Sequence, residues 1–366
     1  MMSADRISAR ELQELLAAGQ PVTVVDIRSP ADREWSIPGS LQFDAYDAVR
    51  SGSLGPLAGR DFPPGRVVTV CGMGATAAKA TDLLRARGVH AMTLEGGMRA
   101  WSLAWNTAQT TISGCEVVQV RRTGKGCLSY IVESQSEAVV IDASVDPDVY
   151  VRLLRELGWR LVAVADTHIH ADHLSRSRLL AQQQRVDLSL PAQDRTQYPF
   201  RPIADGDRIA FGSAALVAMR TPGHTKESTT YLLDNDAAFT GDTLFLAGVG
   251  RPDLEGGAHE ESASRARLLH QSISRILELP EPALILPGHV SEPIPFNGRI
   301  LATTVGTIRD TVALARLDSA AFVEAVLARI PPNPPNHSRI VELNERGELP
   351  EDPSDMEAGA NRCAVA

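Results

Sequence analysis

The first hundred residues show short apolar runs that alternate with segments of helical pattern. Valine-rich runs at 21–27 and 66–70 predict buried strands, and a further strand is expected at 89–94. A helical stretch over 76–87 separates the last two of these strands. Strands that alternate with helices are typical of a parallel α/β sheet. This arrangement places Cys71 on a loop at the carboxyl end of a strand.

Later in the chain the pattern changes to strands in series, interrupted by a few helices. Strands are predicted at 116–122, 128–133, 138–142, 160–166, 208–211, 214–219, 229–233, 237–240 and 283–286, and helices at 148–157, 175–183 and 260–277. We therefore expect an α/β domain at 1–105, a polar linker at 106–114 and a second domain at 115–345. The acidic segment of small residues at 346–366 is expected to be disordered.

Composition narrows the function classes. The chain has 366 residues, of which 43% are hydrophobic and 22% charged, as in ordinary soluble proteins. A net charge of −9 and only three lysines argue against nucleic acid or an anionic membrane as partner. No apolar run suits a signal peptide or a membrane span. The four cysteines form no Cys-x-x-Cys pair, so we expect free thiols and a cytoplasmic location.

The densest group of histidine and aspartate side chains follows the apolar run at 160–166. His168, His170, Asp172 and His173 occupy six consecutive positions where that strand gives way to a loop. Neutral imidazole and carboxylate both bind divalent first-row metals, and His-x-His spacing at a strand end can aim two rings the same way. A histidine-rich surface loop is the chance alternative. Five of the nine histidines, however, lie in motifs of this kind, which favours a metal site.

Three later strands each end on another potential ligand. Thr221–His224 and Leu286–His289 both contain Pro-Gly-His, and Thr240–Asp242 is Thr-Gly-Asp. Together with His-x-His-x-Asp-His, this series resembles the metallo-β-lactamase superfamily over about residues 115–315. The resemblance implies an αβ/βα four-layer sandwich with the metal in a cleft between two sheets.

Two kinds of reaction within that superfamily fit the metal motif. Thioesterases similar to glyoxalase II use two metals to activate water, whereas persulfide dioxygenases use one ferrous ion and O₂ to oxidise a thiol persulfide to sulfite. Three stretches resemble the bacterial persulfide dioxygenases: Thr221–Tyr231, Gly241–Leu254 and Pro331–Asn344. Glyoxalase II-like sequences carry a second histidine soon after Gly-His, and here Glu227 and its neighbours occupy those positions.

The dioxygenase resemblance implies specific roles for the site residues. One Fe(II) per chain would be held by two histidines and a carboxylate, namely His168, His224 and Asp242. The remaining candidates would either orient these ligands or hold a second metal: His170, Asp172, His173 and His289. Under the hydrolase alternative the metal would be zinc. Arg251 resembles a family arginine near the thiol substrate, while the absence of an aromatic residue after His289 leaves the carrier thiol open.

The first domain resembles a rhodanese over nearly all of residues 5–105. The resemblance rests on Asp26–Arg28, Ile37–Gly39, Cys71 and Glu95–Trp101. Glycines after Cys71 let backbone N–H groups point inward, and a helix begins there, so the loop favours a thiolate or persulfide anion. The sequence departs from the family because Ser36 precedes Ile-Pro-Gly and the loop has no cation.

The leading interpretation is a sulfur-metabolism enzyme in which rhodanese and persulfide dioxygenase are fused. Its partners would be a low-molecular-weight thiol persulfide and O₂, with neither nucleic acid nor membrane, and the sequence leaves a homo-oligomer open. The alternative is a metal-dependent thioester hydrolase with a non-catalytic first domain. A third hypothesis makes the first domain a sulfur-binding or docking module only.

Overall fold

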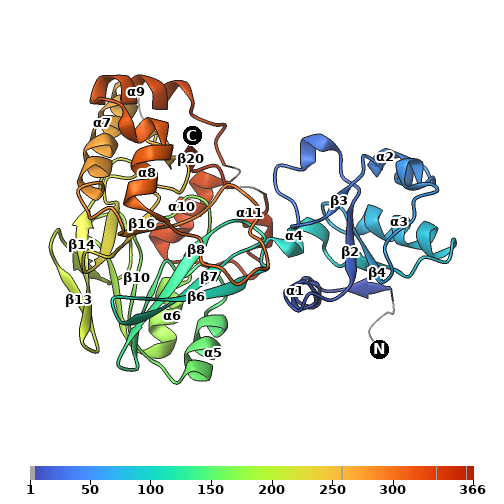
Figure 1. Ribbon diagram of the computed structural model, residues 1–366, viewed down its shortest axis with the longest axis horizontal. Helices are drawn as coiled ribbons and strands as arrows, with labels where there is room; N and C mark the ends of the chain where they lie inside the picture. The colour runs from blue at the N-terminus through green and yellow to red at the C-terminus, as the bar shows by residue number, and fades with distance from the viewer. Residues whose placement is uncertain (1–4, 257–258, 335, 360) are drawn as a thin grey trace.

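The computed structural model describes residues 5–256, 259–334, 336–359 and 361–366. Two domains lie side by side, and the C-terminal segment returns to the boundary between them (Figure 1). Within these described ranges, no helix combines the length and the apolar character needed to cross a bilayer.

The first domain is a parallel sheet covered on both faces. Its strands run in the order β1-β5-β4-β2-β3: β1 (Arg6–Ile7), β2 (Val22–Asp26), β3 (Leu41–Gln42), β4 (Arg66–Val70) and β5 (Ala91–Leu94). Its helices are α1 (Ala9–Ala17), α2 (Tyr46–Arg50), α3 (Ala75–Arg85) and α4 (Gly97–Trp101). Adjacent residues of β2 face opposite sides, since Val25 packs with α2 and α3 while Val24 packs with α1 and α4. The α/β prediction is confirmed.

The second domain contains two large sheets. The seven-stranded sheet has the order β12-β11-β10-β9-β8-β7-β6: β6 (Asn106–Ile112), β7 (Cys115–Arg121), β8 (Leu128–Ser134), β9 (Glu137–Ile141), β10 (Arg160–Ala165), β11 (Asp187–Pro191) and β12 (Arg201–Ile203). The six-stranded sheet has the order β13-β14-β15-β16-β18-β19: β13 (Arg208–Phe211), β14 (Ala214–Arg220), β15 (Thr229–Leu233), β16 (Ala237–Gly241), β18 (Leu284–Pro287) and β19 (Thr303–Thr304). The strands predicted from the apolar runs are all present.

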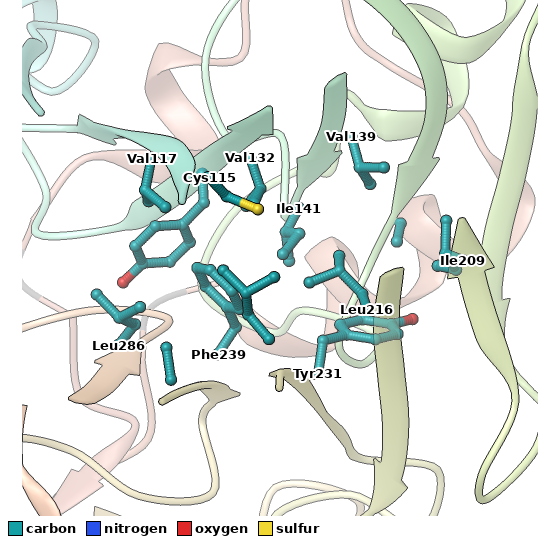
Figure 2. Packing of buried hydrophobic residues seen from close by; sticks show 14 of the residues in the cluster. Cys115, Val117, Val132, Val139, Ile141, Ile209, Leu216, Tyr231, Phe239 and Leu286 are labelled. Atoms are coloured by element: carbon teal, nitrogen blue, oxygen red, sulfur yellow. The ribbon is translucent and has the colours of Figure 1, made fainter. Parts of the chain in front are cut away.

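Apolar side chains from the two sheets interdigitate and form the central core (Figure 2). Val117, Val132 and Ile141 project from the seven-stranded sheet toward Tyr231 and Phe239 of the six-stranded sheet. All five side chains are at most 1% exposed. Because this core ties the sheets together, the loops at their common edge are held in fixed positions.

Helices cover the outer faces and complete a four-layer sandwich. α5 (Pro147–Leu157) and α6 (Ser177–Gln184) pack on the seven-stranded sheet. α7 (His259–Ile276), α8 (Val305–Thr311) and α9 (Ser319–Ala328) pack on the six-stranded sheet. Two further helices, α10 (His337–Arg346) and α11 (Ser354–Glu357), follow in the chain, and Pro335 of the proline-rich stretch lies outside the described residues. The predicted αβ/βα architecture is confirmed.

The predicted linker at 106–114 is wrong. Residues Asn106–Ile112 form β6, which pairs antiparallel with β7 along its whole length. The strand is polar because it is the last of its sheet, so that one edge and part of one face meet water. Polar composition alone therefore suggested a linker where the chain makes an edge strand.

The predicted disorder of 346–366 is also wrong for the described residues of this segment. It contains α11 and a short strand, β20 (Ala364–Val365), which pairs with β17 (Val249–Gly250). The Glu357 and Cys363 side chains are 0% exposed. Glu357 forms ion pairs with Arg122 and Arg176, so distant cations neutralise a charge that local composition marked as solvated.

Candidate metal centre

The candidate ligands meet at one edge of the sandwich because each follows the end of a strand. His168 comes three residues after β10, in the seven-stranded sheet. His224, Asp242 and His289 follow β14, β16 and β18 of the six-stranded sheet. The backbone at Gly288 lies very close to the Asp242 side chain. A Cβ atom on Gly288 would lie 2.7 Å from Asp242 Oδ1, so the turn before His289 requires glycine.

Three ligand atoms face one another. His168 Nε2 lies 3.7 Å and His224 Nε2 lies 3.6 Å from Asp242 Oδ2. All three side chains are buried, and these three atoms have no hydrogen-bond partner among the described residues. A buried polar atom without a partner costs about 1–3 kcal/mol. Three such acceptors directed at a common point fit a cation, so the donor set suits a metal ion.

The Nδ1 atoms of the two histidine ligands are hydrogen-bonded to other groups of the protein. The Thr167 hydroxyl donates to Asp142 Oδ2 at 2.8 Å, so it accepts from His168 Nδ1 at 2.9 Å. His224 Nδ1 donates to the Arg251 carbonyl oxygen at 2.8 Å. These contacts place the protons of both rings on Nδ1 and leave the Nε2 lone pairs free.

His289 has a different place in the arrangement. Its Nδ1 lies 2.9 Å from Asp242 Oδ1, the oxygen that does not face His168 and His224. Burial raises the pKa of Asp242, but His289, and then His168, outweigh it and hold that pKa well below its usual range. Asp242 is therefore a carboxylate in this setting, with Oδ2 available to a metal.

His170 is directed away from the three ligands. Its Nε2 lies 3.3 Å from Asp142 Oδ1, in a group that also includes Asp166. Burial lowers the pKa of His170, but the charge and hydrogen bond of Asp142 outweigh it and raise that pKa to about 10. His170 Nε2 thus faces Asp142 rather than the three ligand atoms, which fits a residue that supports the loop.

Asp172 is occupied by His173 and two further neighbours, whereas His173 Nε2 is buried without a hydrogen-bond partner among the described residues. His173 Nδ1 lies 3.0 Å from Asp172 Oδ1. Asp172 Oδ2 accepts from Asn361 Nδ2 at 2.6 Å and from Cys127 Sγ at 3.1 Å. Both carboxylate oxygens therefore have partners within the protein.

Two residues outside the motif hold its backbone. The Asn344 amide donates to the carbonyl oxygens of His170 and His173 at 2.8 and 2.9 Å. Glu227 accepts from the Ile169 backbone N–H at 3.0 Å. Sequence patterns placed both residues in characteristic stretches but gave no indication that they contact this loop.

Arg251, which the resemblance placed near the thiol substrate, has its guanidinium engaged by the protein. Its guanidinium is 0% exposed, and it donates to Asp253, Asn333 and two backbone carbonyls of Pro332 and Arg362. With these N–H groups engaged, the arginine anchors neighbouring segments and presents its own carbonyl oxygen to His224. These contacts do not support a direct role for Arg251 in holding a thiol.

Cys71 lies in a separate cavity of about 600 Å³ in the first domain. Its Sγ accepts from the backbone N–H groups of Gly74 at 3.2 Å and Ala77 at 3.3 Å, at the start of α3. Arg28 and Arg99 also line the cavity, although the loop itself has no cation. Sequence reasoning missed these two guanidinium groups because they come from other segments. Both are engaged in ion pairs, Arg28 with Asp26 and Arg99 with acidic residues of the C-terminal segment.

Comparison with known proteins assigns both domains. Residues 8–104 match the sequence profile of the Rhodanese-like domain, and residues 122–289 match that of the Metallo-beta-lactamase superfamily. The chain therefore joins a rhodanese-like domain to a metallo-β-lactamase-fold domain, as its motifs suggested.

Individual relatives are similar over part of the chain. The mitochondrial persulfide dioxygenase ETHE1 of Homo sapiens is 37% identical over 156 residues, which are 42% of this chain and 59% of the human protein. The hydroxyacylglutathione hydrolase of Brucella anthropi is 34% identical over 37% of this chain and 50% of its own length. The crystal structure of ETHE1 from Myxococcus xanthus superposes with a TM-score of 0.56 and 25% identity, covering 66% of this chain and 100% of that one.

Proposed function

We propose that this chain, in which a rhodanese-like domain precedes a metallo-β-lactamase-fold domain, is a persulfide dioxygenase with one ferrous ion. The reaction would be R–S–SH + O₂ + H₂O → R–SH + SO₃²⁻ + 2H⁺, where R is a low-molecular-weight carrier such as glutathione. The similarity to persulfide dioxygenases from two organisms supports this proposal.

One observation supports the single-metal site most directly. His168, His224 and Asp242 direct unpaired buried acceptor atoms at a shared point, and these atoms lie within 4.8 Å of one another. Of the groups that a second metal would need, both carboxylate oxygens of Asp172 already have partners, whereas the Nε2 atoms of His173 and His289 are buried without one. Two histidines and one carboxylate leave coordination positions open for substrate and O₂, as in non-haem iron oxygenases.

The protein residues fix the geometry of that site. A ferrous ion, when bound, would pass electrons from the persulfide sulfur to O₂, which redox-inert Zn²⁺ cannot do. Thr167 and the Arg251 carbonyl hold the two imidazole rings, and His289 holds the carboxylate. The buried setting keeps bulk water away from the reacting sulfur.

A cavity of about 340 Å³ next to His289 is suited to the carrier thiol. Its wall includes Phe245, Leu246, Val290, Ile294 and Leu301. Phe245 also packs against the His289 ring, with the ring centroids 4.2 Å apart. A mainly apolar wall beside a metal centre would admit the body of a small thiol and bring its terminal sulfur toward Asp242.

In the first domain we assign sulfane-sulfur transfer to Cys71. The backbone N–H groups at Gly74 and Ala77 would stabilise the terminal sulfur of a Cys71 persulfide. Four free cysteines fit a reducing compartment, and we propose the cytoplasm.

The experiment measures O₂ uptake and sulfite release by protein loaded anaerobically with Fe(II) and given glutathione persulfide. Iron-loaded protein should consume one O₂ for each sulfite, and His168→Ala should abolish both. An exposed histidine of the first domain supplies the control, since His90→Ala should behave as the unchanged protein does. Rapid hydrolysis of a glutathione thioester by protein holding two zinc ions, with no O₂ uptake by the iron form, would instead establish the hydrolase alternative.

A further inference from the structure

The C-terminal segment joins the two domains. Arg99 of the first domain forms ion pairs with Asp352 at 2.5 Å and Asp355 at 2.7 Å. Farther along, Arg362 pairs with Glu34 of the first domain at 2.5 Å. In Figure 1, α11 accordingly lies beside α4 at the domain boundary. Ion pairs therefore hold the described parts of the segment against the first domain.

One part of this segment borders the cavity that contains Cys71. Asp355, Ala358 and Gly359 form its wall opposite residues of the Cys71 loop, including Gly72 and Met73. The cavity that contains Cys71 is thus lined in part by a segment that belongs to the second domain.

A later part of the segment enters the metal centre. Asn361 donates to Asp172 Oδ2 at 2.6 Å, and its own carbonyl Oδ1 accepts from the Cys363 backbone N–H at 3.1 Å. Cys363 Sγ, a carboxylate oxygen of Asp242 and a ring nitrogen of His289 lie within 4.8 Å of one another. This thiol is 0% exposed, and His289 Nε2 beside it has no partner among the described residues.

The surroundings of Cys363 differ from those of a cysteine that only fills a core. Cys115 is equally buried, but it packs among apolar side chains such as Val117 and Val132. Cys363 Sγ instead lies within 4.8 Å of a carboxylate oxygen of Asp242 and a ring nitrogen of His289. A buried unpartnered imidazole nitrogen next to it indicates that this position takes a polar group.

The distance along the chain allows one thiol to serve both sites. Cys363 at the metal centre is four positions after Gly359, which lies in the wall of the Cys71 cavity. An extended chain spans about 3.3–3.6 Å per residue, so the two positions are at most roughly 14 Å apart. The segment after Cys363 is held by β20, a strand of two residues, which a local opening can release.

We propose that Cys363 is a sulfur-relay residue that takes sulfane sulfur from Cys71 and presents it at the metal centre. The Cys363 sulfur attacks the outer sulfur of the Cys71 persulfide. A new S–S bond forms at Cys363 while the S–S bond at Cys71 breaks, and the thiol proton of Cys363 passes to the departing Cys71 sulfur. The exchange, Cys71–S–SH + Cys363–SH → Cys71–SH + Cys363–S–SH, is redox-neutral and needs no further reactant.

This inference rests on the proposed function for its purpose, but its test is independent of the metal. Metal-free protein is treated anaerobically with glutathione persulfide, then cleaved and analysed by mass spectrometry for added sulfur. Cleavage after Glu357 releases Ala358–Ala366, in which Cys363 is the one cysteine. We expect added sulfur first on the Cys71 peptide and then on this C-terminal peptide.

Three variants separate the outcomes. In Cys71→Ser the C-terminal peptide should stay unlabelled, and in Cys363→Ser or Cys363→Ala the sulfur should accumulate on Cys71. The core variant Cys115→Ala should label as the unchanged protein does. Labelling of Cys363 at an undiminished rate in Cys71→Ser would overturn the relay, and so would a labelled Cys71 beside an unlabelled Cys363. Failure of O₂ uptake by the iron form would contradict the proposed function while leaving the labelling result intact.

Discussion

His289 Nδ1 lies 2.9 Å from Asp242 Oδ1, and this contact turns the other carboxylate oxygen toward His168 and His224. In the proposed site the imidazole would act through the carboxylate rather than as a ligand of the same set. The relationship distinguishes two kinds of residue, those that bind the metal and those that orient a ligand, and the two kinds should respond differently to substitution.

Replacing Asp242 removes an anionic ligand. Asp242→Ala should reduce bound iron to background and abolish O₂ uptake, because two neutral imidazoles alone hold Fe(II) weakly. Metal analysis after anaerobic loading checks this, with the exposed carboxylate variant Asp47→Ala as control. Full iron occupancy in Asp242→Ala would contradict the assigned ligand set.

Replacing His289 should separate metal binding from turnover. His289→Ala is expected to keep most of the iron while activity falls roughly ten- to a hundredfold, the usual effect of losing a group that orients a ligand. Iron content and steady-state O₂ uptake are measured on the same samples. Loss of one whole metal ion per chain on this change would point to a two-metal site.

Cys71 should take sulfur from a persulfide in preference to thiosulfate. Its Sγ has two backbone N–H donors, and Arg28 and Arg99 at the cavity are already engaged in ion pairs. A thiosulfate dianion needs more positive charge than a helix end offers, which is about half an elementary charge. Intact-mass analysis should show added sulfur from glutathione persulfide and little from thiosulfate, with both lost in Cys71→Ser. Equal labelling by the two donors would show that the paired guanidinium groups suffice.

Glu357 should be a large contributor to the docking of the C-terminal segment. Its carboxylate is 0% exposed and pairs with Arg122 at 2.9 Å and Arg176 at 2.5 Å. Glu357→Ala would leave two buried cations unpaired, at a cost of about 3–5 kcal/mol. Urea unfolding and hydrogen exchange of residues 354–366 measure this loss. Glu14→Ala, which breaks an exposed pair on α1, should leave the unfolding midpoint almost unchanged.

The same ion pair predicts a pH dependence. Burial raises the pKa of Glu357, but Arg122 and then Arg176 outweigh it and hold that pKa well below the ordinary value of 4.5. A group whose pKa is lowered on folding stabilises the protein above its unfolded pKa and loses that contribution as the pH falls. The stability difference between the unchanged protein and Glu357→Gln should therefore be fully present at neutral pH and shrink below about pH 4.5. A difference that stays constant down to acid pH would exclude this titration.

Local patterns determined most of the architecture. Apolar runs such as 66–70 and 237–240 could be assigned to strands because a strand that is buried in a sheet appears in the sequence as a short run of apolar residues. The ligand types could be identified for a related reason, since His168, His224 and Asp242 each follow a strand within a few residues. Both kinds of signal lie within short stretches of the chain.

Tertiary structure alone decided which of these groups converge. Nothing local indicates that His170 is directed toward Asp142, or that Arg251 is occupied by Asn333 and the backbone carbonyls of Pro332 and Arg362. These outcomes depend on which neighbours the two packed sheets bring near each side chain.

The C-terminal segment shows the same limit most clearly. Its composition predicted disorder, yet Glu357 pairs with Arg122, which is 235 positions away, and Arg176, which is 181 positions away. In an isolated peptide this charge would favour contact with water. In the folded protein buried cations neutralise it, so the charged segment can be buried. Those cations, and with them the position of Cys363 beside Asp242, exist only after the second domain has assembled.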